Sequence, residues 1–366
     1  NAAMPKPPLR PLHIRPFSAG DFPELDALNT LIQRGGSALR SEVVCEVRAH
    51  GESLPIHVLE LGNPSPDVPA VGFFGGVHGV ERIGAQVVLA FLHSLVERLH
   101  WDDTLSRQLE HVRLVFMPLV NPGGMINHTR CNPAGVDLMR NAPVEAIDPV
   151  PFLLGGQRIS RRLPWYRGAP GAEMEPEAKA LCAAVSQRLL PHRFALSLDC
   201  HSGFGSRDRL WFPYAGTRRP VDCLPEIYAL RSLFRSTHPH HSLYTIEPQS
   251  QQYTTHGDLW DYLYDQSRQD NRCLFMPLTL ELGSWLWVKK SPTQIFSFKG
   301  MFNPMATHRH HRTLRQHLTL LDFLIRAAIS HSRWRPQPAA RNALTEAARA
   351  YWYPASILVP GIDALR

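Results

Sequence analysis

The chain has 366 residues, of which 44% are hydrophobic, so it can bury a large core as one α/β domain or two smaller ones. The formal net charge of +7 is spread thinly, apart from a basic run at 307–312 that we expect to be a solvated surface. No nucleic-acid-binding signature accompanies that run, and no stretch of 18 apolar residues occurs. We therefore expect neither a nucleic-acid partner nor a membrane span.

The cysteines and the N-terminus bear on the compartment. Six cysteines are scattered without a Cys-x-x-Cys pair, which in a chain of this length favours reduced thiols over a disulfide framework. The N-terminal residues lack the apolar core of a signal peptide. We expect a cytoplasmic protein, and the sequence leaves its oligomeric state undefined.

The first elements along the chain are an arm, a helix and a hairpin. Residues 1–16 are proline-rich and are expected to form an extended arm, and helical spacing follows over 22–34. Two alternating segments, 41–48 and 54–61, read as an antiparallel hairpin at the edge of a sheet.

Strand and helix patterns then alternate. Strands are expected at 71–74, 112–120, 194–200, 243–246 and 274–281, and helices at 81–99, 173–190, 224–236, 307–328 and 342–351. A turn is expected at 121–124, a long loop bordering the site at 142–172, and irregular structure at 285–303. This order predicts an α/β fold with a mixed, mainly parallel central sheet and helices on both faces.

Three of the predicted buried strands end in residues that can bind a metal ion. His78 and Glu81 follow the first of them, where a loop or first helical turn lets an imidazole and a carboxylate three residues apart close on one ion. His57 and Glu60 have the same spacing inside a strand, which points them to opposite faces, so we interpret His57 as structural.

His201 and Glu281 end the two later strands. A catalytic zinc site needs three protein ligands and an open position, and two histidines with one glutamate form one such set. A further carboxylate can take the proton of the metal-bound water. The sequence thus predicts a site for one Zn²⁺ ion, with a carboxylate beside it.

These motifs resemble those of the zinc metallocarboxypeptidases of the carboxypeptidase A type. The resemblance covers roughly residues 50–330 and implies that His78, Glu81 and His201 bind the zinc. It also implies a zinc-carboxypeptidase-like fold. In that fold Glu281, in the segment Leu278-Thr-Leu-Glu-Leu, would be the general base and acid of the reaction. We expect an N-terminal arm and helix over 1–40, this catalytic domain over 41–330, and a C-terminal tail with one helix over 331–366.

Weaker matches follow in the order of the family. By resemblance, Arg130 stabilises the oxyanion, and Tyr253 closes over the substrate. The segment Gly135-Val-Asp-Leu-Met-Arg-Asn resembles the family's Gly-Val-Asp-x-Asn-Arg-Asn, which implies that Arg140 binds the substrate carboxylate. Met139 stands where the family has asparagine, so half of the carboxylate clamp is missing, and Asn141 could compensate. Trp260 falls near the position that sets side-chain preference, which argues against a pocket selective for Lys or Arg.

The resemblance implies a zinc-dependent hydrolase that cleaves an amide bond, most readily a metallocarboxypeptidase that releases a C-terminal residue. One alternative is an N-acyl-amino-acid deacylase of the aspartoacylase and succinylglutamate desuccinylase type, which shares the metal motif but typically carries a β-rich domain after the core. Another is a non-catalytic metal-binding module. The substrate would be a peptide or an N-acyl amino acid. No Gly-x-Ser-x-Gly elbow or phosphate-binding loop occurs, which excludes serine hydrolases and P-loop enzymes.

Overall fold

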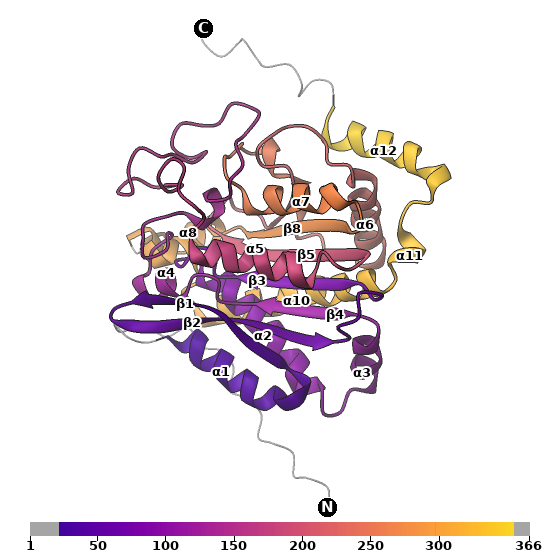
Figure 1. Cartoon of the computed structure of the whole chain (residues 1–366), viewed down its shortest axis with the longest axis horizontal. Helices are drawn as coiled ribbons and strands as arrows, with labels where there is room; N and C mark the ends of the chain where they lie inside the picture. Colours follow the sequence, from indigo (N-terminus) through magenta and orange to yellow (C-terminus); the bar gives the residue numbers. More distant parts are fainter. Residues whose placement is uncertain (1–21, 297, 355–366) are drawn as a thin grey trace, which may run out of the picture.

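The computed structural model describes residues 22–296 and 298–354, so the predicted arm over 1–16 lies outside the described residues. One sheet of eight strands, in the order β1-β2-β4-β3-β5-β8-β6-β7, runs through the molecule, and helices lie on both of its faces (Figure 1). The predicted fold class, a mixed and mainly parallel sheet between helices, is confirmed.

The strands of this sheet are β1 (Arg40–Ala49), β2 (Glu52–Gly62), β3 (Ala70–Gly75), β4 (Arg113–Met117), β5 (Phe194–Ser202), β6 (Arg209–Phe212), β7 (Thr245–Pro248) and β8 (Leu274–Leu282). The central strands β4, β3, β5 and β8 are parallel, and every residue of β3 and β5 is buried. Burial on both faces explains why these strands read as continuous apolar runs. The hairpin of β1 and β2 forms one edge, as predicted.

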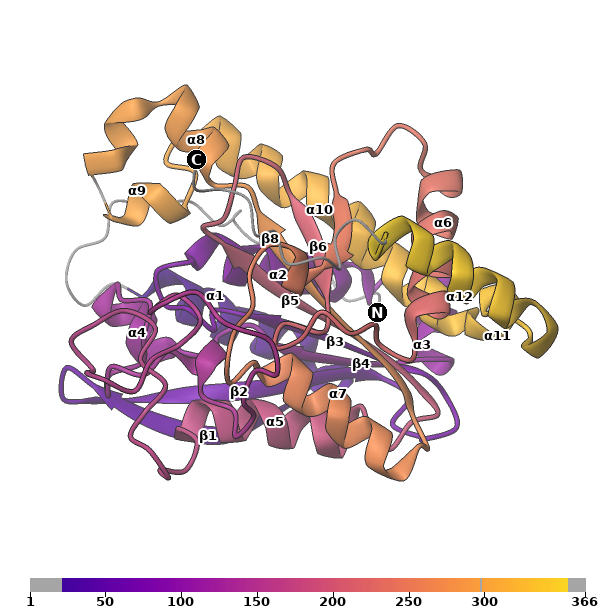
Figure 2. The same ribbon diagram turned by 90° about the horizontal axis from the view of Figure 1, so that it is seen from above.

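The α-helices are α1 (Pro23–Gly35), α2 (Arg82–Arg98), α3 (Asp103–Glu110), α4 (Pro122–Asn127), α5 (Pro176–Arg188), α6 (Leu224–Thr237), α7 (Leu259–Asp270), α8 (Trp285–Lys290), α9 (Phe298–Phe302), α10 (Thr307–Ile329), α11 (His331–Trp334) and α12 (Pro338–Trp352). Helices α2 and α10 pack on one face of the sheet, and α5 and α7 pack on the other (Figure 2). Among the described residues, no helix is both long and apolar enough to cross a bilayer.

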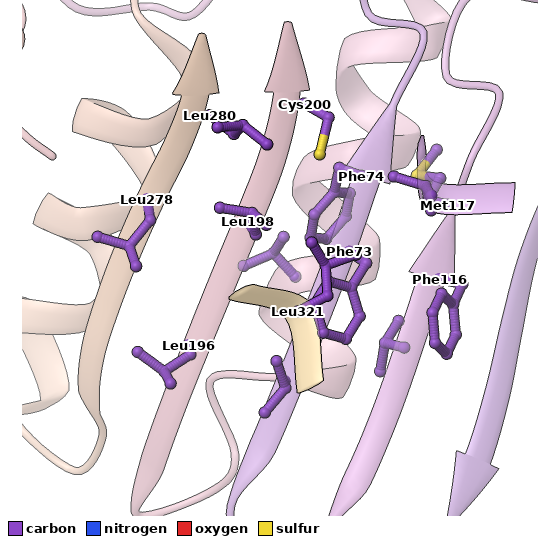
Figure 3. Close-up of a cluster of buried hydrophobic side chains, with 14 of the residues drawn as sticks. Phe73, Phe74, Phe116, Met117, Leu196, Leu198, Cys200, Leu278, Leu280 and Leu321 are labelled. Carbon is purple, nitrogen blue, oxygen red and sulfur yellow. The ribbon is translucent and has the colours of Figure 1, made fainter. Parts of the chain in front are cut away.

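The core between the sheet and α10 is formed by side chains that alternate along the central strands. Phe73 of β3 stacks on Phe116 of β4 with ring centroids 5.2 Å apart, and Leu321 of α10 covers them (Figure 3). Cys200 of β5 lies in the same cluster. Because successive residues of a strand point to opposite faces, its neighbour His201 points away from this core, as predicted.

Three of the segments for which a structure was predicted differ from that prediction. Residues 121–124 begin the short helix α4, because Asn121 caps it by accepting a hydrogen bond from the Gly124 N–H at 2.8 Å and Pro122 occupies its first turn. The region 285–303 contains α8 and α9 rather than irregular structure. The basic run at 307–312 is only partly solvated, since His310 is fully buried on the core side of α10 and bonds to Gln86.

Candidate metal centre and active site

The three predicted metal ligands are delivered by neighbouring elements at the carboxyl ends of β3 and β5. His78 lies in the loop after β3, Glu81 is the residue that caps the start of α2, and His201 lies near the end of β5. Gly84, in the first turn of α2, makes this approach possible. A Cβ there would lie 2.1 Å from the Cys200 carbonyl oxygen, so only glycine lets the start of α2 contact the end of β5.

The ligand atoms of these three residues converge. His78 Nδ1 lies 3.0 Å from Glu81 Oε1, His201 Nδ1 lies 3.1 Å from Glu81 Oε2, and the two Nδ1 atoms are 3.2 Å apart. Zinc binds nitrogen and oxygen at about 2.0–2.2 Å in tetrahedral sites, which places neighbouring ligand atoms about 3.3 Å apart. The residues present therefore fit a zinc ion, and the sequence prediction that they come together is confirmed.

Two aspartates hold the outer nitrogens of the histidines. His78 Nε2 lies 3.0 Å from Asp137 Oδ1, and His201 Nε2 lies 2.7 Å from Asp199 Oδ2. Such carboxylates orient a ligating imidazole and make its inner nitrogen a better metal ligand. The indole N–H of Trp260 donates to Asp199 Oδ2 at 2.9 Å, so this aspartate is itself held in place.

The sequence analysis gave neither aspartate this role. Asp199 precedes His201 by two residues in a strand, a spacing that puts both on one face and could have signalled the pair. The side chain of Asp137 pairs with both His78 and Arg130.

The electrostatics of the cluster favour a cation. Burial raises the pKa of Glu81, but the facing imidazoles of His78 and His201 outweigh it and leave that pKa below its ordinary value. Burial lowers the pKa of His201, but Asp199 and Glu81 outweigh it and raise that pKa well above its ordinary value. A buried carboxylate between imidazoles that are themselves held by carboxylates is a site where positive charge is stabilised.

Glu281 lies beside the ligands through the register of the sheet. It is the direct partner of His201 across the parallel pair β5 and β8, and its Oε1 accepts a hydrogen bond from the Phe204 N–H at 3.0 Å. Burial, followed by the nearby charge of Glu81, raises the pKa of Glu281 to about 8. A carboxyl group with a pKa near neutrality can both accept and return a proton.

Arg130 and Arg140 line the same cavity. Arg130 donates from Nε to Asp137 Oδ2 at 2.8 Å and from Nη1 to Glu81 Oε1 at 3.2 Å, which places its guanidinium against the metal ligands. Arg140 donates to the Met139 and Leu154 carbonyl oxygens at 3.4 Å each. Its buried Nη2 has no hydrogen-bond partner among the described residues, so a strong donor is left for a ligand.

Tyr253 also lines the cavity, with its ring 6.0 Å from the Arg140 guanidinium. Met139 faces the cavity at the position where an asparagine was expected by resemblance. Asn141 is not among the lining residues. Its amide donates to the Arg167 carbonyl at 3.0 Å and accepts from the Glu175 N–H at 2.7 Å, so it anchors the ends of the long loop over 142–172.

The cavity has a volume of about 750 Å³. The long loop over 142–172 contributes Leu154 and residues 161–165 to its wall, so the prediction that this loop borders the site is confirmed. Trp260 does not line the cavity, in contrast to the expectation for a residue that sets side-chain preference. Its indole is buried behind His201 and packs on Phe74.

Comparison of sequences identifies relatives of this chain. A model of the family described as zinc carboxypeptidase matches residues 45–288. The chain is 26% identical over 265 residues to carboxypeptidase SOL1 of Arabidopsis thaliana, in an alignment that covers 69% of this chain and 49% of SOL1. The chain thus spans about half the length of that relative.

Comparison of structures gives the same fold. The crystal structure of thrombin activatable fibrinolysis inhibitor matches with a TM-score of 0.62 and 19% identity, covering 83% of this chain and 72% of that one. Carboxypeptidase A from Helicoverpa armigera matches with a TM-score of 0.60 and 17% identity, covering 85% of this chain and 74% of the other. At these identities the likeness establishes a shared fold.

Proposed function

Because the chain belongs to the zinc carboxypeptidase family, we propose that it is a zinc-dependent hydrolase that releases the C-terminal residue of a peptide. The observation that carries the proposal is the convergence of the His78, Glu81 and His201 ligand atoms, with Glu281 beside them in the sheet. The family uses one zinc ion, and these three residues would hold it. Bound zinc supplies Lewis-acid polarisation of a carbonyl and lowers the pKa of water towards about 7.

The side chains of this site divide the remaining work. Glu281 takes a proton from the attacking water and returns it to the leaving amine, a role that suits its raised pKa. Arg130 places a positive charge beside the metal ligands, where negative charge develops on the carbonyl oxygen. Tyr253 lies over the cavity next to Arg140 and covers the bound substrate.

Arg140 is the proposed ligand of the substrate carboxylate. Arg140 lines the cavity and its Nη2 has no hydrogen-bond partner among the described residues, and a guanidinium forms charge-assisted, often bidentate bonds to carboxylates. Asn141 takes no direct part in our proposal, since its amide is engaged by backbone groups of the long loop. It acts as a positioning residue that holds this loop against the cavity.

A second candidate function is the hydrolysis of N-acyl amino acids. Met139 favours it, because this apolar side chain faces the cavity where a second carboxylate-binding group was expected. The segment after the core favours the peptidase, because its described part consists of helices α11 and α12 rather than a β-rich domain. In both reactions the same residues would activate water, so a panel of peptides and N-acyl amino acids distinguishes the two.

The test of the proposed chemistry is the substitution Glu281→Gln. This side chain keeps the size and the hydrogen bond of Glu281 but cannot take a proton, so we expect zinc content to be retained and hydrolysis to fall by about 10²–10⁴-fold. Zinc is measured by mass spectrometry and hydrolysis with the substrate panel. The control Glu226→Gln changes another buried glutamate that lies far from Glu281 in the sequence, and this variant should hydrolyse the substrate panel like the wild type.

Unchanged hydrolysis in Glu281→Gln would remove this residue from the mechanism. A wild-type protein that binds no zinc and hydrolyses neither substrate class would instead support a non-catalytic module.

We further propose that the protein works in the cytoplasm. All six cysteines are free in the structure, and those at 182, 200, 223 and 273 are buried, which suits a reducing compartment. Alkylation of the protein isolated from its source, with and without prior reduction, tests this, because six reactive thiols are expected in the unfolded protein in both cases.

A further inference from the structure

A second cavity, of about 650 Å³, lies apart from the metal centre. We propose that this cavity binds a small phosphorylated molecule. The proposal concerns a site separate from the catalytic one and stands or falls independently of the hydrolytic function.

The second cavity lies on the other face of the sheet from the metal centre. Glu281 and Leu282 are successive residues of β8, so their side chains point to opposite faces. Glu281 lines the first cavity and Leu282 lines the second, and no lining residue is common to the two. The wall of the second cavity comes from β8, the β5–β6 loop, and helices α6, α8 and α10, which lie on the same side of the sheet in Figure 2.

The lining of this cavity carries a strong excess of positive charge. Its cationic side chains are Arg207, Arg231, Arg235, Lys290, Arg309 and Arg312. Among the residues that the structure describes, none of these six is in a salt bridge. Like charges gathered around one cavity repel each other, so this arrangement favours an anion between them.

The single carboxylate of the lining does not neutralise these cations. Asp208 Oδ1 accepts the Gly283 N–H at 2.9 Å, and Asp208 Oδ2 accepts the side-chain amide of Gln316 at 2.8 Å. Burial raises the pKa of Asp208. This carboxylate therefore holds the floor of the cavity together and leaves the cations of the rim unpaired.

The deepest cation is Arg231, which is 9% exposed. Its guanidinium lies 4.1 Å from the ring centre of Tyr351 and 5.7 Å from that of Tyr228, and aromatic faces are its only described partners. No carboxylate or carbonyl acceptor is recorded for this guanidinium among the described residues, so its donors remain available to a ligand in the cavity. His241, also in the lining, has a buried Nε2 without a hydrogen-bond partner among the described residues.

The chemistry of the lining favours a phosphate-bearing ligand. Five of the six cations are arginines, whose planar guanidinium groups match the oxygens of phosphate and bind them bidentately. The cavity is larger than an inorganic anion requires. Phe234, Leu286 and Trp287 supply an apolar wall beside the charged rim, which would hold the organic part of the molecule.

The test is a calorimetric titration of the purified protein at constant ionic strength. The probes are inorganic phosphate, pyrophosphate, AMP, ATP and citrate. We expect saturable binding of at least one phosphorylated organic probe, tighter than that of phosphate or citrate. The double variant Arg235→Gln/Arg312→Gln should weaken this binding at least about tenfold, because it removes two charge-assisted partners. Hydrolysis of the substrate panel should be unchanged, since neither residue lies at the metal centre.

The matched control is Arg219→Gln/Arg315→Gln, which loses the same charge at exposed positions outside the cavity. It should bind the probe within about twofold of the wild type. An equal loss of affinity in both double variants would overturn the proposal, because net charge alone would then explain the binding. Citrate bound as tightly as the phosphorylated probes, or no saturable binding by any probe, would overturn it as well.

Discussion

At the scale of single residues, the metal centre depends on side chains behind the ligands. Asp137 and Asp199 each contact the outer nitrogen of one histidine, and both aspartates are fully buried. A histidine ring without such a partner can rotate or take the wrong tautomer, which lowers its affinity for zinc. The precise position of the ligands therefore follows from residues that never touch the ion.

Asp199→Asn tests this role. The amide keeps the size of the carboxylate and an acceptor for His201 and Trp260, but it removes the negative charge that supports the imidazole. We expect the dissociation constant for zinc to rise about 10–100-fold, with little change in folding. Zinc affinity is measured by competition with a chelator, and folding is measured by circular dichroism.

Asp265→Asn provides the control, because Asp265 is exposed and contacts Tyr214 rather than a ligand. Zinc affinity in this variant should equal that of the wild type. If Asp199→Asn bound zinc with wild-type affinity, the aspartate would be a packing residue only.

The convergence of His78, Glu81 and His201 could be predicted from the sequence, because each follows a run of buried strand residues. The sequence could not predict which partner each arginine takes. Asp137 lies seven residues from Arg130 and three from Arg140, and only the path of the chain around α4 decides that Arg130 pairs with it. Nor could it predict the hydrogen bonds of the Asn141 amide, because their partners are backbone groups far away in the sequence.

At the scale of elements, α10 places a row of histidines against the sheet. His310 and His317 are seven residues apart, so they lie on the same side of the helix, and both are fully buried. His317 Nδ1 lies 2.8 Å from the Tyr244 hydroxyl group. Burial, with a smaller effect of His241, lowers the pKa of His317 to about 3 from its ordinary 6.5, although Asp208 Oδ2 lies 3.6 Å from His317 Nε2.

This lowered pKa predicts a loss of stability in acid. His317 binds a proton near pH 6.5 in the unfolded chain and only near pH 3 in the folded chain. Its contribution to the free energy of unfolding is therefore fully present above pH 6.5 and is lost as the pH falls. Between these two pKa values the free energy of unfolding falls by roughly 1.4 kcal/mol per pH unit. Between about pH 7.5 and pH 5.5, we expect the free energy of unfolding to fall by about 1 kcal/mol less in His317→Gln than in the wild type.

The free energy of unfolding at each pH is measured by urea denaturation. The informative quantity is the difference between the variant and the wild type at each pH, because every other titrating group contributes to both proteins. His308→Gln, on the same helix but exposed, should keep the pH dependence of the wild type. The same dependence in His317→Gln would show that His317 does not titrate as proposed.

Long and buried helices and strands could be predicted from the sequence, and short ones could not. The long apolar strands β3, β5 and β8 and the helices α2, α6 and α10 lie where the sequence pattern places them. Strand β6 was missed, because its four residues, Arg209–Phe212, show no run long enough to signal a strand. It forms only through pairing with β8 and β7, which are distant in the sequence.

At the scale of the whole molecule, the C-terminal helix is joined to the catalytic unit. The sequence suggested a tail over 331–366, yet α12 packs on α6 and its Trp352 is 2% exposed. The indole N–H of Trp352 donates to the Ile246 carbonyl oxygen at 2.8 Å. Because Ile246 lies in β7, the last strand of the sheet, α12 covers part of an otherwise open edge.

We therefore propose that α12 and the sheet fold as one cooperative unit, and Trp352→Ala tests it. The Trp352 ring packs edge-on to Phe212 and Tyr228, with centroids 4.9 and 5.6 Å away. Removing it leaves a cavity and frees the sheet edge, so we expect the free energy of unfolding to fall by about 3–5 kcal/mol. Urea denaturation followed by both fluorescence and zinc release measures the effect.

The exposed residue Arg349, one turn earlier in α12, supplies the control for this experiment. Arg349→Ala should change stability by no more than about 0.5 kcal/mol, since its side chain makes no buried contact. A Trp352→Ala variant as stable as the wild type would show that α12 is an appendage that unfolds by itself. A single transition at lower urea, with zinc released in the same step, would show that the edge strand, the helix and the metal centre unfold together.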